Sequence, residues 1–376
     1  MKKSSGAGLF GMIALAAILV LGLAACGGSI EGGSGGGGGP LPGAGTPADP
    51  WLISSAAQLQ NLANEVNLGE DKSGEFFRLA NDINLSAYNS GTGWRPIGND
   101  CTTAFSGTFD GDGFVISNLF INSGATSDPV GLFGCIDGAT VENLGVAIAA
   151  GGVTGNFYDM VGGLAGFVFN STVSNSYATG NVNGNDFVGG LAGYLRDGAI
   201  TNCYFTGKVE GSERVGGVAG EVMDSAVSNC YATSSVTGNN YVGGVAGMVY
   251  NNSTITNCVA LNESLIASGG AGPNFGRVAG AFGVGSVPIG TALTNNLAFV
   301  GIISSIVFSG TALDGAPITK AQARNQDYYN GSPAIPQLGW DFATPVWKWS
   351  ATLTYPLPIL DWQTQTPILP FGHPML

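Results

Sequence analysis

The hexapeptide Val-Gly-Gly-Leu-Ala-Gly at residues 161–166 decides the fold, because close copies of it follow at a fixed interval. The copies begin at Val188, Val215 and Val242, so each lies 27 residues after the one before. Between them, apolar residues return at the same places, separated by Asn, Asp, Gly and Ser. A strict period of this length is typical of stacked structural units that bury their apolar faces against one another.

Each copy divides into short runs of β-favouring residues, such as 161–168, 172–179 and 181–183. These runs are too short to be pairs of helices. Stacked at about 4.8 Å, successive copies would pair every strand with its equivalent in the next coil. The sequence therefore predicts an all-β protein, a parallel right-handed β-helix with coils of about 27 residues.

One asparagine in each copy is expected to form a bend of the coil. Asparagine tolerates the left-handed backbone conformation, and its amide can stack on the amide of the next coil. The residues one and three places after it should then point into the core, and the residue two places after it should point outward. The asparagines are Asn118, Asn175, Asn202, Asn229 and Asn257.

The outward position after the asparagine carries an aromatic ring in four copies: Phe120, Tyr177, Tyr204 and Tyr231. We expect these rings to form an exposed file along the solenoid. Two interpretations stay open. Stacked rings stabilise neighbouring coils by about 0.5–1 kcal/mol per pair, and the same rings could be the ligand face for a glycan or an extended peptide.

Both ends of the β-helix are expected to carry caps that cover unpaired strands. Ser55 and Gln58 form a capping-box pattern, and an apolar stripe follows, so a helix is predicted over 55–67. Thr319 begins a second such pattern, and the tryptophan-rich remainder should close the solenoid. The predicted divisions are a signal peptide at 1–25, a lipidated tether at 26–49, an N-terminal cap with irregular coils at 50–129, the repeats at 130–315 and a C-terminal cap at 316–376.

Residues 1–25 have the features of a secretory signal, with Lys2 and Lys3 before a long apolar stretch. The stretch ends in Leu-Ala-Ala before Cys26, which resembles a bacterial lipobox, whose cysteine becomes lipid-modified. Three acyl chains on Cys26 would anchor the protein durably to a membrane. The glycine-rich residues 27–49 are typical of a flexible tether, with an end-to-end distance of about 26 Å. An ordinary signal peptide or a membrane helix is the alternative.

The formal net charge is −13, and loss of residues 1–25 would leave 10 basic residues against 25 acidic ones, or −15. A surface this acidic disfavours binding to nucleic acid. His373 is the single histidine of the chain. A single histidine near the C-terminus disfavours a histidine-based catalytic triad, and it cannot form a multi-histidine zinc site. We expect no catalytic residue and no cofactor beyond a weak calcium site.

Five cysteines follow Cys26, an odd number that leaves at least one thiol outside any intrachain disulfide. Cys101 and Cys135 are expected to form a disulfide, because export favours oxidation and the two lie in neighbouring loops or coils. The other three share one position of the repeat and are expected to form a buried apolar column. They are Cys203, Cys230 and Cys258.

Two columns of acidic residues are predicted along the solenoid. The first is Asp159, Asp186 and Glu213. The second is Asp197 and Asp224, with Asn170 and Asn251 at the same position of the flanking copies. Stacked carboxylates about 5 Å apart repel each other unless water or a cation lies between them. We favour ordinary turn residues, and a weak Ca²⁺ site at the first column is the alternative.

The hexapeptide and the downstream Asn-Cys-Tyr-Ala-Thr at residues 229–233 resemble the GLUG-type repeats of bacterial surface proteins, over residues 130–260. The resemblance implies a role as a cell-surface adhesin or as a non-catalytic part of a larger secreted protein. Together with the predicted anchor, it leads us to expect a monomeric lipoprotein of the bacterial cell envelope. We expect it on the outer membrane, exposed at the cell surface, with a glycan or a protein as its ligand.

Two other function classes stay open. An envelope scaffold needs only the anchor, the tether and the repeats. A polysaccharide lyase or glycosidase would need a cleft with converging acids and a basic residue at the reaction centre. Arg196, Lys208 and Arg214 fall at different positions of the repeat, so an enzyme is the least favoured class.

Overall fold

The computed structural model describes the repeats, the segment before them and parts of the segment after them. Predictions that concern residues 1–25, Cys26 or Asp159 lie outside the described residues. None of the helices in the described part combines the length and the hydropathy that a membrane-spanning helix needs. The described residues are 39–124, 128–156, 160–268, 274–282, 291–305, 312–330, 338–342, 346–349, 357–363 and 373–374.

The helix predicted before the coils is present as α1 (Ala56–Asn67), which follows strand β1 (Trp51–Ile53). The Ser55 hydroxyl accepts a hydrogen bond from the amide of Gln58 at 3.2 Å. The Gln58 side chain accepts one from the amide of Ser54 at 2.8 Å, so the second half of the capping box is shifted by one residue. The apolar stripe of α1 is buried against the first coils.

Parallel sheets form the β-helix in the described residues. The coils from residue 140 to residue 282 pass through sheet 1, sheet 2, sheet 3 and sheet 4 in that order, whereas the described earlier coils have no strand in sheet 3. Sheet 1 has the order β1, β2 (Phe76–Leu79), β4 (Thr108–Asp110), β7 (Thr140–Glu142), β11 (Thr172–Ser174), β15 (Ala199–Thr201), β19 (Ala226–Ser228), β24 (Thr254–Thr256), β29 (Ala292–Thr294). Sheet 2 has the order β3 (Ile83–Asn84), β5 (Val115–Asn122), β8 (Gly145–Thr154), β12 (Tyr177–Asn183), β16 (Tyr204–Glu210), β20 (Tyr231–Ala232), β25 (Val259–Ala260), β30 (Leu297–Phe299), β32 (Ala316–Ile318). A side path of sheet 2 adds β21 (Ser235–Gly238), β26 (Ser264–Ala267) and β31 (Ile303–Ser304).

The two remaining parallel sheets complete each coil. Sheet 3 has the order β9 (Met160–Gly162), β13 (Phe187–Gly189), β17 (Glu213–Gly216), β22 (Asn240–Gly243), β27 (Phe275–Gly276). Sheet 4 has the order β6 (Phe133–Asp137), β10 (Ala165–Phe169), β14 (Ala192–Arg196), β18 (Ala219–Met223), β23 (Ala246–Tyr250), β28 (Ala279–Phe282).

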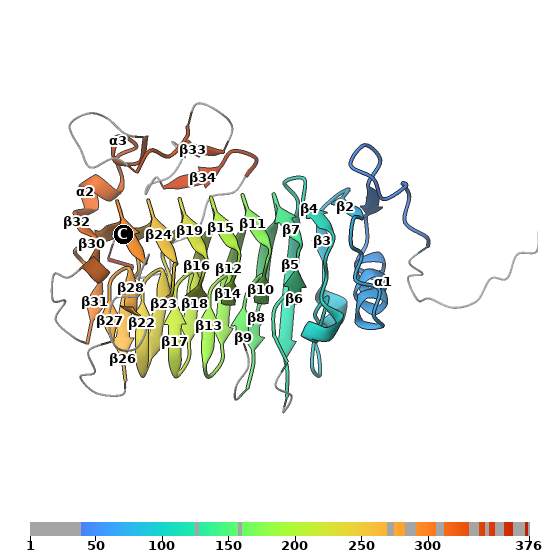
Figure 1. Ribbon diagram of the computed structural model, residues 1–376, viewed down its shortest axis with the longest axis horizontal. Coiled ribbons are helices and arrows are strands. Elements are labelled where there is room, and N and C mark those ends of the chain that lie inside the picture. The colour runs from blue at the N-terminus through green and yellow to red at the C-terminus, as the bar shows by residue number, and fades with distance from the viewer. Residues whose placement is uncertain are drawn as a thin grey trace, which may run out of the picture. The chain divides into compact units, whose positions relative to one another are not determined.

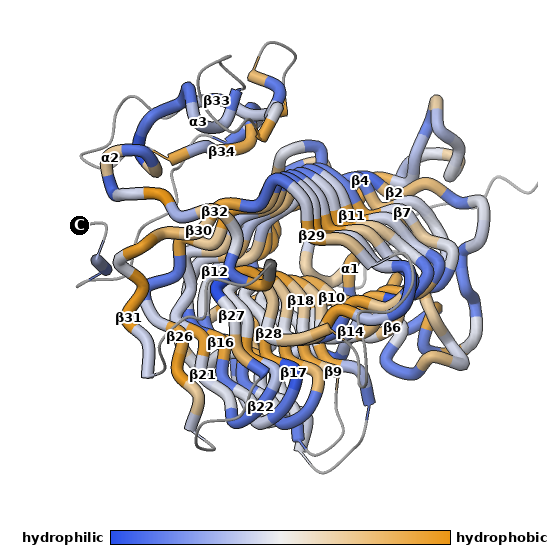
Figure 2. The backbone as a smooth tube through the Cα atoms, turned by 60° about the vertical axis from the view of Figure 1, so that its left-hand side comes forward, coloured by the Kyte–Doolittle hydropathy of each residue, from blue (hydrophilic) through white to orange (hydrophobic). Residues whose placement is uncertain are grey.

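Equivalent residues of successive copies are strand partners, because Val161 pairs with Val188, Val188 with Val215, and Val215 with Val242. One 27-residue copy is therefore one coil. These four side chains are fully buried. Figure 1 shows the strands stacked in parallel, and Figure 2 shows the same succession of hydrophobic and hydrophilic segments in neighbouring coils. The predicted parallel β-helix is confirmed.

The predicted asparagine bends are confirmed, and we call them the asparagine ladder. Asn118, Asn175, Asn202, Asn229 and Asn257 all have positive φ, between 47° and 59°. The Asn202 amide donates to the Asn175 side chain at 3.2 Å, and the Asn229 amide donates to Asn202 at 3.1 Å. The residues one and three places later are buried, as expected. Each bend is thus bonded to the bend of the coil before it.

The double glycine of the hexapeptide lies where neighbouring coils approach each other closely. A Cβ atom at Gly190 would lie 2.2 Å from the carbonyl oxygen of Gly217 and 2.2 Å from the ring of Phe205. No side chain fits there, so the hexapeptide needs glycine at this place for steric reasons.

The cysteines adopt the expected arrangement. Cys101 and Cys135 form a disulfide, with Cα atoms 5.1 Å apart. Cys203, Cys230 and Cys258 are free and fully buried. Each of these thiols donates to the carbonyl of the residue two places before it, at 3.1–3.4 Å. Burial raises the pKa of the Cys230 thiol well above its usual range, which keeps it protonated.

The C-terminal segment differs from the predicted closing cap. The capping box at Thr319 is present at the start of α2 (Lys320–Ala323), and α3 (Asp327–Asn330) follows. Beyond α3, residues 338–342, 346–349 and 357–363 contact the outer side of much earlier coils, along the stack of sheets 1 and 2 (Figure 1). They include the antiparallel pair β33 (Trp347–Trp349) and β34 (Pro358–Leu360). We call these three stretches the C-terminal strap.

The strap reaches a long way back along the β-helix. The indole of Trp340 donates to the carbonyl of Asn257 at 2.8 Å, and the indole of Trp362 donates to the carbonyl of Asn175 at 3.3 Å. These two asparagines are three coils apart on the asparagine ladder. The strap therefore covers a side of the solenoid, and its tryptophans serve this contact.

Candidate binding site

The predicted aromatic file exists as a column of stacked rings, which we call the tyrosine column. The ring centroids of Tyr177 and Tyr204 lie 5.0 Å apart, and those of Tyr204 and Tyr231 lie 4.8 Å apart. Their exposed fractions are 9%, 1% and 0%. Phe120 does not continue the column, because the strand partner of Tyr177 in the preceding coil is Gly145. The prediction of an exposed file is therefore wrong.

The C-terminal strap is the reason for this burial. Trp362 stacks on Tyr177, with ring centroids 5.6 Å apart. The Tyr231 hydroxyl donates to the carbonyl of Pro358 at 2.9 Å. Burial raises the pKa of Tyr204 and of Tyr231 well above the usual value for a phenol. The strap thus occupies the place that a ligand of the tyrosine column would take.

The first acidic column surrounds an arginine. Arg214 forms an ion pair with Asp186, and its guanidinium lies 2.8 Å from the Glu221 carboxylate and 3.7 Å from that of Glu213. It also lies over the ring of Phe187, 4.6 Å from the centroid. Asp186 and Glu213 thus have a cationic partner from the chain itself, which argues against a calcium ion between them. In the described part of the chain, no group of three or more His, Cys, Asp and Glu side chains could hold a metal ion.

The second acidic column lies in a polar groove at the corner between sheet 4 and sheet 1. The residue at this corner has positive φ in four successive coils: Asn170, Asp197, Asp224 and Asn251, with φ between 47° and 52°. The groove has a volume of about 610 Å³. We call it the corner groove, and it is lined by Asn170, Ser171, Thr172, Asp197, Gly198, Ala199, Asp224, Ser225, Ala226, Asn252 and Thr254.

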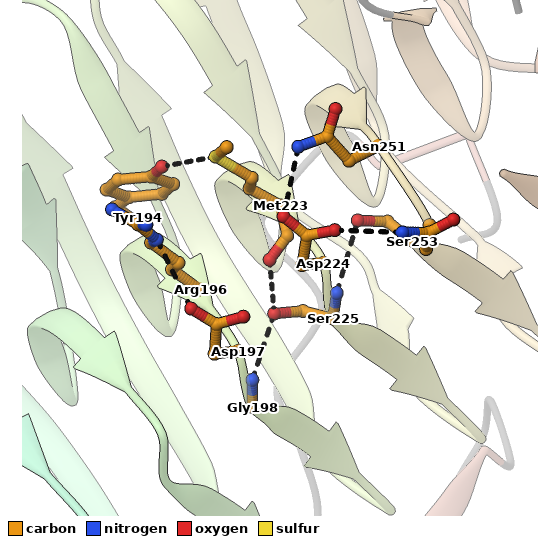
Figure 3. Close-up of polar contacts among 10 residues, drawn as sticks. Tyr194, Arg196, Asp197, Gly198, Met223, Asp224, Ser225, Asn251 and Ser253 are labelled. Atoms are coloured by element: carbon orange, nitrogen blue, oxygen red, sulfur yellow. Dashed lines mark hydrogen bonds and ion pairs between the residues drawn. The ribbon is translucent and has the colours of Figure 1, made fainter. Parts of the chain in front are cut away.

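The two carboxylates of the corner groove have partners from the chain itself. Asp224 accepts a hydrogen bond from the side-chain amide of Asn251 at 3.0 Å (Figure 3). It accepts a second one from the side-chain amide of Asn252 at 3.2 Å. The bond from Asn251 above all lowers the pKa of Asp224 below its ordinary value. Asp197 lies 3.3 Å from the guanidinium of Arg196, its neighbour in sequence. Two carboxylates against one guanidinium leave the groove negatively charged.

Serine side chains fix the backbone beneath the groove. The buried Ser225 hydroxyl accepts a hydrogen bond from the amide of Gly198 at 3.0 Å and donates to the carbonyl of Met223 at 2.6 Å (Figure 3). The buried Ser253 hydroxyl accepts one from the amide of Ser225 at 3.2 Å. Because these bonds join successive coils, the corner residues are held at the spacing of the coils.

Beside the groove, sheet 4 presents a row of outward side chains, which we call the rim, and two of them are partly exposed aromatic rings. The outward residues of sheet 4 directly before the corner are Phe169, Arg196, Met223 and Tyr250. Arg196 lies over the ring of Phe169, 5.6 Å from its centroid. Two residues earlier on the same strands of sheet 4, Phe167 and Tyr194 stack with ring centroids 5.0 Å apart.

The sequence reasoning did not find this rim. A signal was present, because an aromatic residue follows Ala-Gly in the copies at 161 and 188 and stands again two places after Phe167. The two other copies have Glu221 and Met248 after Ala-Gly, so the aromatic character is not a property of the whole repeat.

The groove is suited to binding and poorly suited to acid catalysis. A glycosidase needs a carboxylic acid that stays protonated at neutral pH, which requires a raised pKa. Asp224 has the opposite shift. Burial raises the pKa of Glu221 and of Glu142, but neither lines the groove, and Glu221 pairs with Arg214. The chemistry of the groove is that of hydrogen-bond acceptors and amides beside aromatic rings.

Comparison with known proteins confirms the repeat. Residues 158–183, 188–210 and 211–237 match the Glug family model, described as the GLUG motif. The chain is 36% identical over 151 residues to halomucin of Haloquadratum walsbyi, covering 38% of this chain and 2% of halomucin. It is 36% identical over 132 residues to a protein of Evansella cellulosilytica provisionally named a Gly-rich membrane protein, covering 32% of this chain and 14% of that protein. The matches therefore span only a small part of either relative.

A solved structure has the same fold. It is that of a protein from Bacteroides ovatus provisionally named an immunoglobulin A1 protease. Its TM-score is 0.64, and the match covers 85% of this chain and 94% of that chain at 22% sequence identity. At this identity the likeness shows a shared β-helix fold.

Proposed function

We propose that this protein is a lipid-anchored protein of the bacterial cell envelope whose β-helix binds an external ligand in the corner groove without catalysing a reaction. The lipobox-like sequence at Cys26 and the glycine-rich tether support the anchor. The names of halomucin and of the Gly-rich membrane protein, which describe those proteins, support a place at the cell surface or membrane. Adhesion is then the expected outcome of binding.

The observation that carries the binding role is the state of the groove carboxylates. Asp224 is ionised and held by two amides, and Asp197 lies beside Arg196. Both stand in a groove with partly exposed rings on one rim. Fixed hydrogen-bonding groups beside an aromatic surface are typical of recognition sites for polar ligands.

The anchor is tested with Cys26→Ser in the full-length protein. Because lipid attachment needs the Cys26 sulfur, the variant should move from the membrane fraction to the soluble fraction. Unmodified wild-type protein found mainly in the soluble fraction would contradict the lipoprotein assignment.

The binding role is tested on an array that carries both glycans and extracellular proteins. Wild-type protein should bind at least one ligand, and Asp224→Asn should weaken that binding. Glu210→Gln makes the same chemical change on sheet 2, away from the groove, and should leave binding unchanged. No binding by the wild type would favour the envelope scaffold, and release of a cleaved product would favour an enzyme.

A further inference from the structure

We infer that the ligand of the corner groove is an uncharged linear glycan that lies parallel to the solenoid axis, with about one sugar unit for each coil. This inference rests on the proposed binding function and names its ligand class. Three properties of the groove lead to it: its direction, its spacing and its charge.

The direction follows from the repeat. The residues that line the groove come in four sets from four successive coils, at 170–172, at 197–199, at 224–226, and at 252 with 254. Equivalent groups therefore recur along the stack of coils and not along any one strand. A ligand that meets more than two of these sets must run across the coils, parallel to the solenoid axis.

The spacing favours a sugar chain over a peptide. Neighbouring coils are about 4.8 Å apart, whereas an extended peptide rises only about 3.3 Å per residue. Peptide groups would fall out of step with the corner residues after one coil. The backbone at this corner is also already bonded between coils, as in Gly198 to Ser225, so a peptide finds no free strand edge there. A sugar unit is longer than an amino-acid residue and carries several hydroxyl groups.

The groups in the groove suit hydroxyl ligands. An ionised carboxylate accepts hydrogen bonds only, and each of its oxygens can accept more than one. Asp224 can therefore accept from ligand hydroxyl groups in addition to its bonds from Asn251 and Asn252. The amides of Asn170 and Asn252 can both donate and accept. On the rim, the ring of Phe169 lies between Arg196 and Phe167, and its exposed part can pack against the apolar C–H groups of a sugar.

The charge of the groove disfavours acidic ligands. The groove holds two carboxylates and one guanidinium, and Asp224 stays ionised far below neutral pH. The whole chain has a net charge of −13. A uronate or sulfate group placed about 4 Å from a carboxylate is repelled by roughly 1 kcal/mol even in water. Uncharged sugars avoid this repulsion.

The experiment measures the affinity of the full-length protein for defined oligosaccharides by calorimetry. The probes are neutral α- and β-linked glucan, mannan and chitin oligosaccharides of two to six units, with uronate and sulfated oligosaccharides as charged counterparts. For at least one neutral series, affinity should rise by about fivefold per unit up to about four units and then level off. Charged counterparts should bind at least tenfold more weakly, and a calcium chelator should have no effect.

Two variants place the glycan in the groove. Asp224→Asn should weaken binding by about tenfold, and Phe169→Ala by about fivefold. Glu210→Gln should bind like the wild type, and circular dichroism should show that all three variants keep the fold.

Affinity that is independent of length, equal binding of charged glycans, or no binding by any neutral series would overturn the inference. A protein ligand on the array that is lost in Asp224→Asn would also overturn it, while leaving the proposed binding function intact.

Discussion

Sheet 1 has a corner at each end of its strands, and the two corners are built alike but end up in different environments. On one side lies the corner groove with Asp197 and Asp224, and on the other lies the asparagine ladder with Asn202 and Asn229. All four residues have φ between 47° and 55°, and in both corners side chains bond to the neighbouring coil. The ladder side is covered by the C-terminal strap, whereas the groove is open.

This difference shows which part of the sequence sets the surface of a solenoid. The repeat places the tyrosine column and the groove residues in equally regular files. The strap, which does not repeat, decides that the tyrosine column is buried and leaves the groove as a surface. Regular spacing is therefore no sign of exposure, and the two corners should respond differently to mutation.

The largest loss of stability is expected for Tyr204→Ala, on the side that the strap covers. The ring is almost fully buried between two other rings and the strap, so its removal should cost about 3–5 kcal/mol, as for other large aromatic residues. Tyr204→Phe loses only the hydroxyl that accepts a bond from Gln363 and should cost about 1 kcal/mol. Thermal unfolding followed by circular dichroism measures both. Equally small shifts of the melting temperature in both variants would show that the tyrosine column is not buried as described.

A smaller difference in stability is expected between substitutions at the two kinds of corner residue. Asn202→Ala should destabilise the protein by about 2–3 kcal/mol, because alanine disfavours positive φ and the ladder bonds are lost. Asn202→Gly keeps the backbone conformation and should cost about half as much. Asp197→Asn, at the open corner, keeps both conformation and polarity and should leave the melting temperature nearly unchanged. A large drop in the melting temperature of Asp197→Asn would mean that the residues of both corners contribute equally to stability.

A change of pH should affect the C-terminal residues and the open groove differently. His373 is buried, with Nε2 2.9 Å from the carbonyl of Leu261, and burial lowers its pKa below 6.5. Its neutral form therefore stabilises the folded state above about pH 6.5, and this contribution is lost as the pH falls toward the lowered pKa. Glu263 opposes the shift and Lys320 adds to it. Asp224 has a lowered pKa, so its contribution is lost only below about pH 3.8.

The measurement is tryptophan fluorescence between pH 7.5 and 5, since four tryptophans lie in the C-terminal strap, at 340, 347, 349 and 362. We expect a fluorescence change in the wild type and a weaker one in His373→Gln, with ligand binding in the groove retained. A change of the same size in both proteins would mean that His373 does not control the docking of the C-terminal residues.

The smallest effect on stability is expected for Asp224→Asn, which changes a partly exposed side chain. Its melting temperature should match that of the wild type within a degree or two, although its ligand affinity falls. A variant that loses stability and affinity together would show that the groove side chain serves the fold, and the contrast between the two corners would fail.

Sequence alone predicts what the repeat controls. The 27-residue interval fixes the strand partners, and the asparagines, the buried cysteine column and the inward apolar files follow from it. The helix at 56–67 and the capping box at Thr319 also follow, because capping depends on residues only three places apart.

The parts that sequence could not predict depend on contacts between distant residues. Trp362 and Asn175 are 187 residues apart, and no period or local pattern links them. The contact of Arg214 with Asp186 likewise depends on how adjacent coils place two unlike residues. The corner groove was visible as a column of acids and amides, but the hollow itself arises only where sheet 4 and sheet 1 meet.

Hydroxyl-radical footprinting of the full-length protein, read by mass spectrometry, tests the contrast between the two corners most directly. The tyrosine column should be protected, with Tyr204 and Tyr231 unmodified, while Met223 and Phe169 on the rim of the groove should be oxidised. Adding the bound glycan should then protect the rim and leave the column as it was. Rapid oxidation of Tyr204 and Tyr231 beside a protected Met223 would contradict the account, because it would make the tyrosine column the open surface.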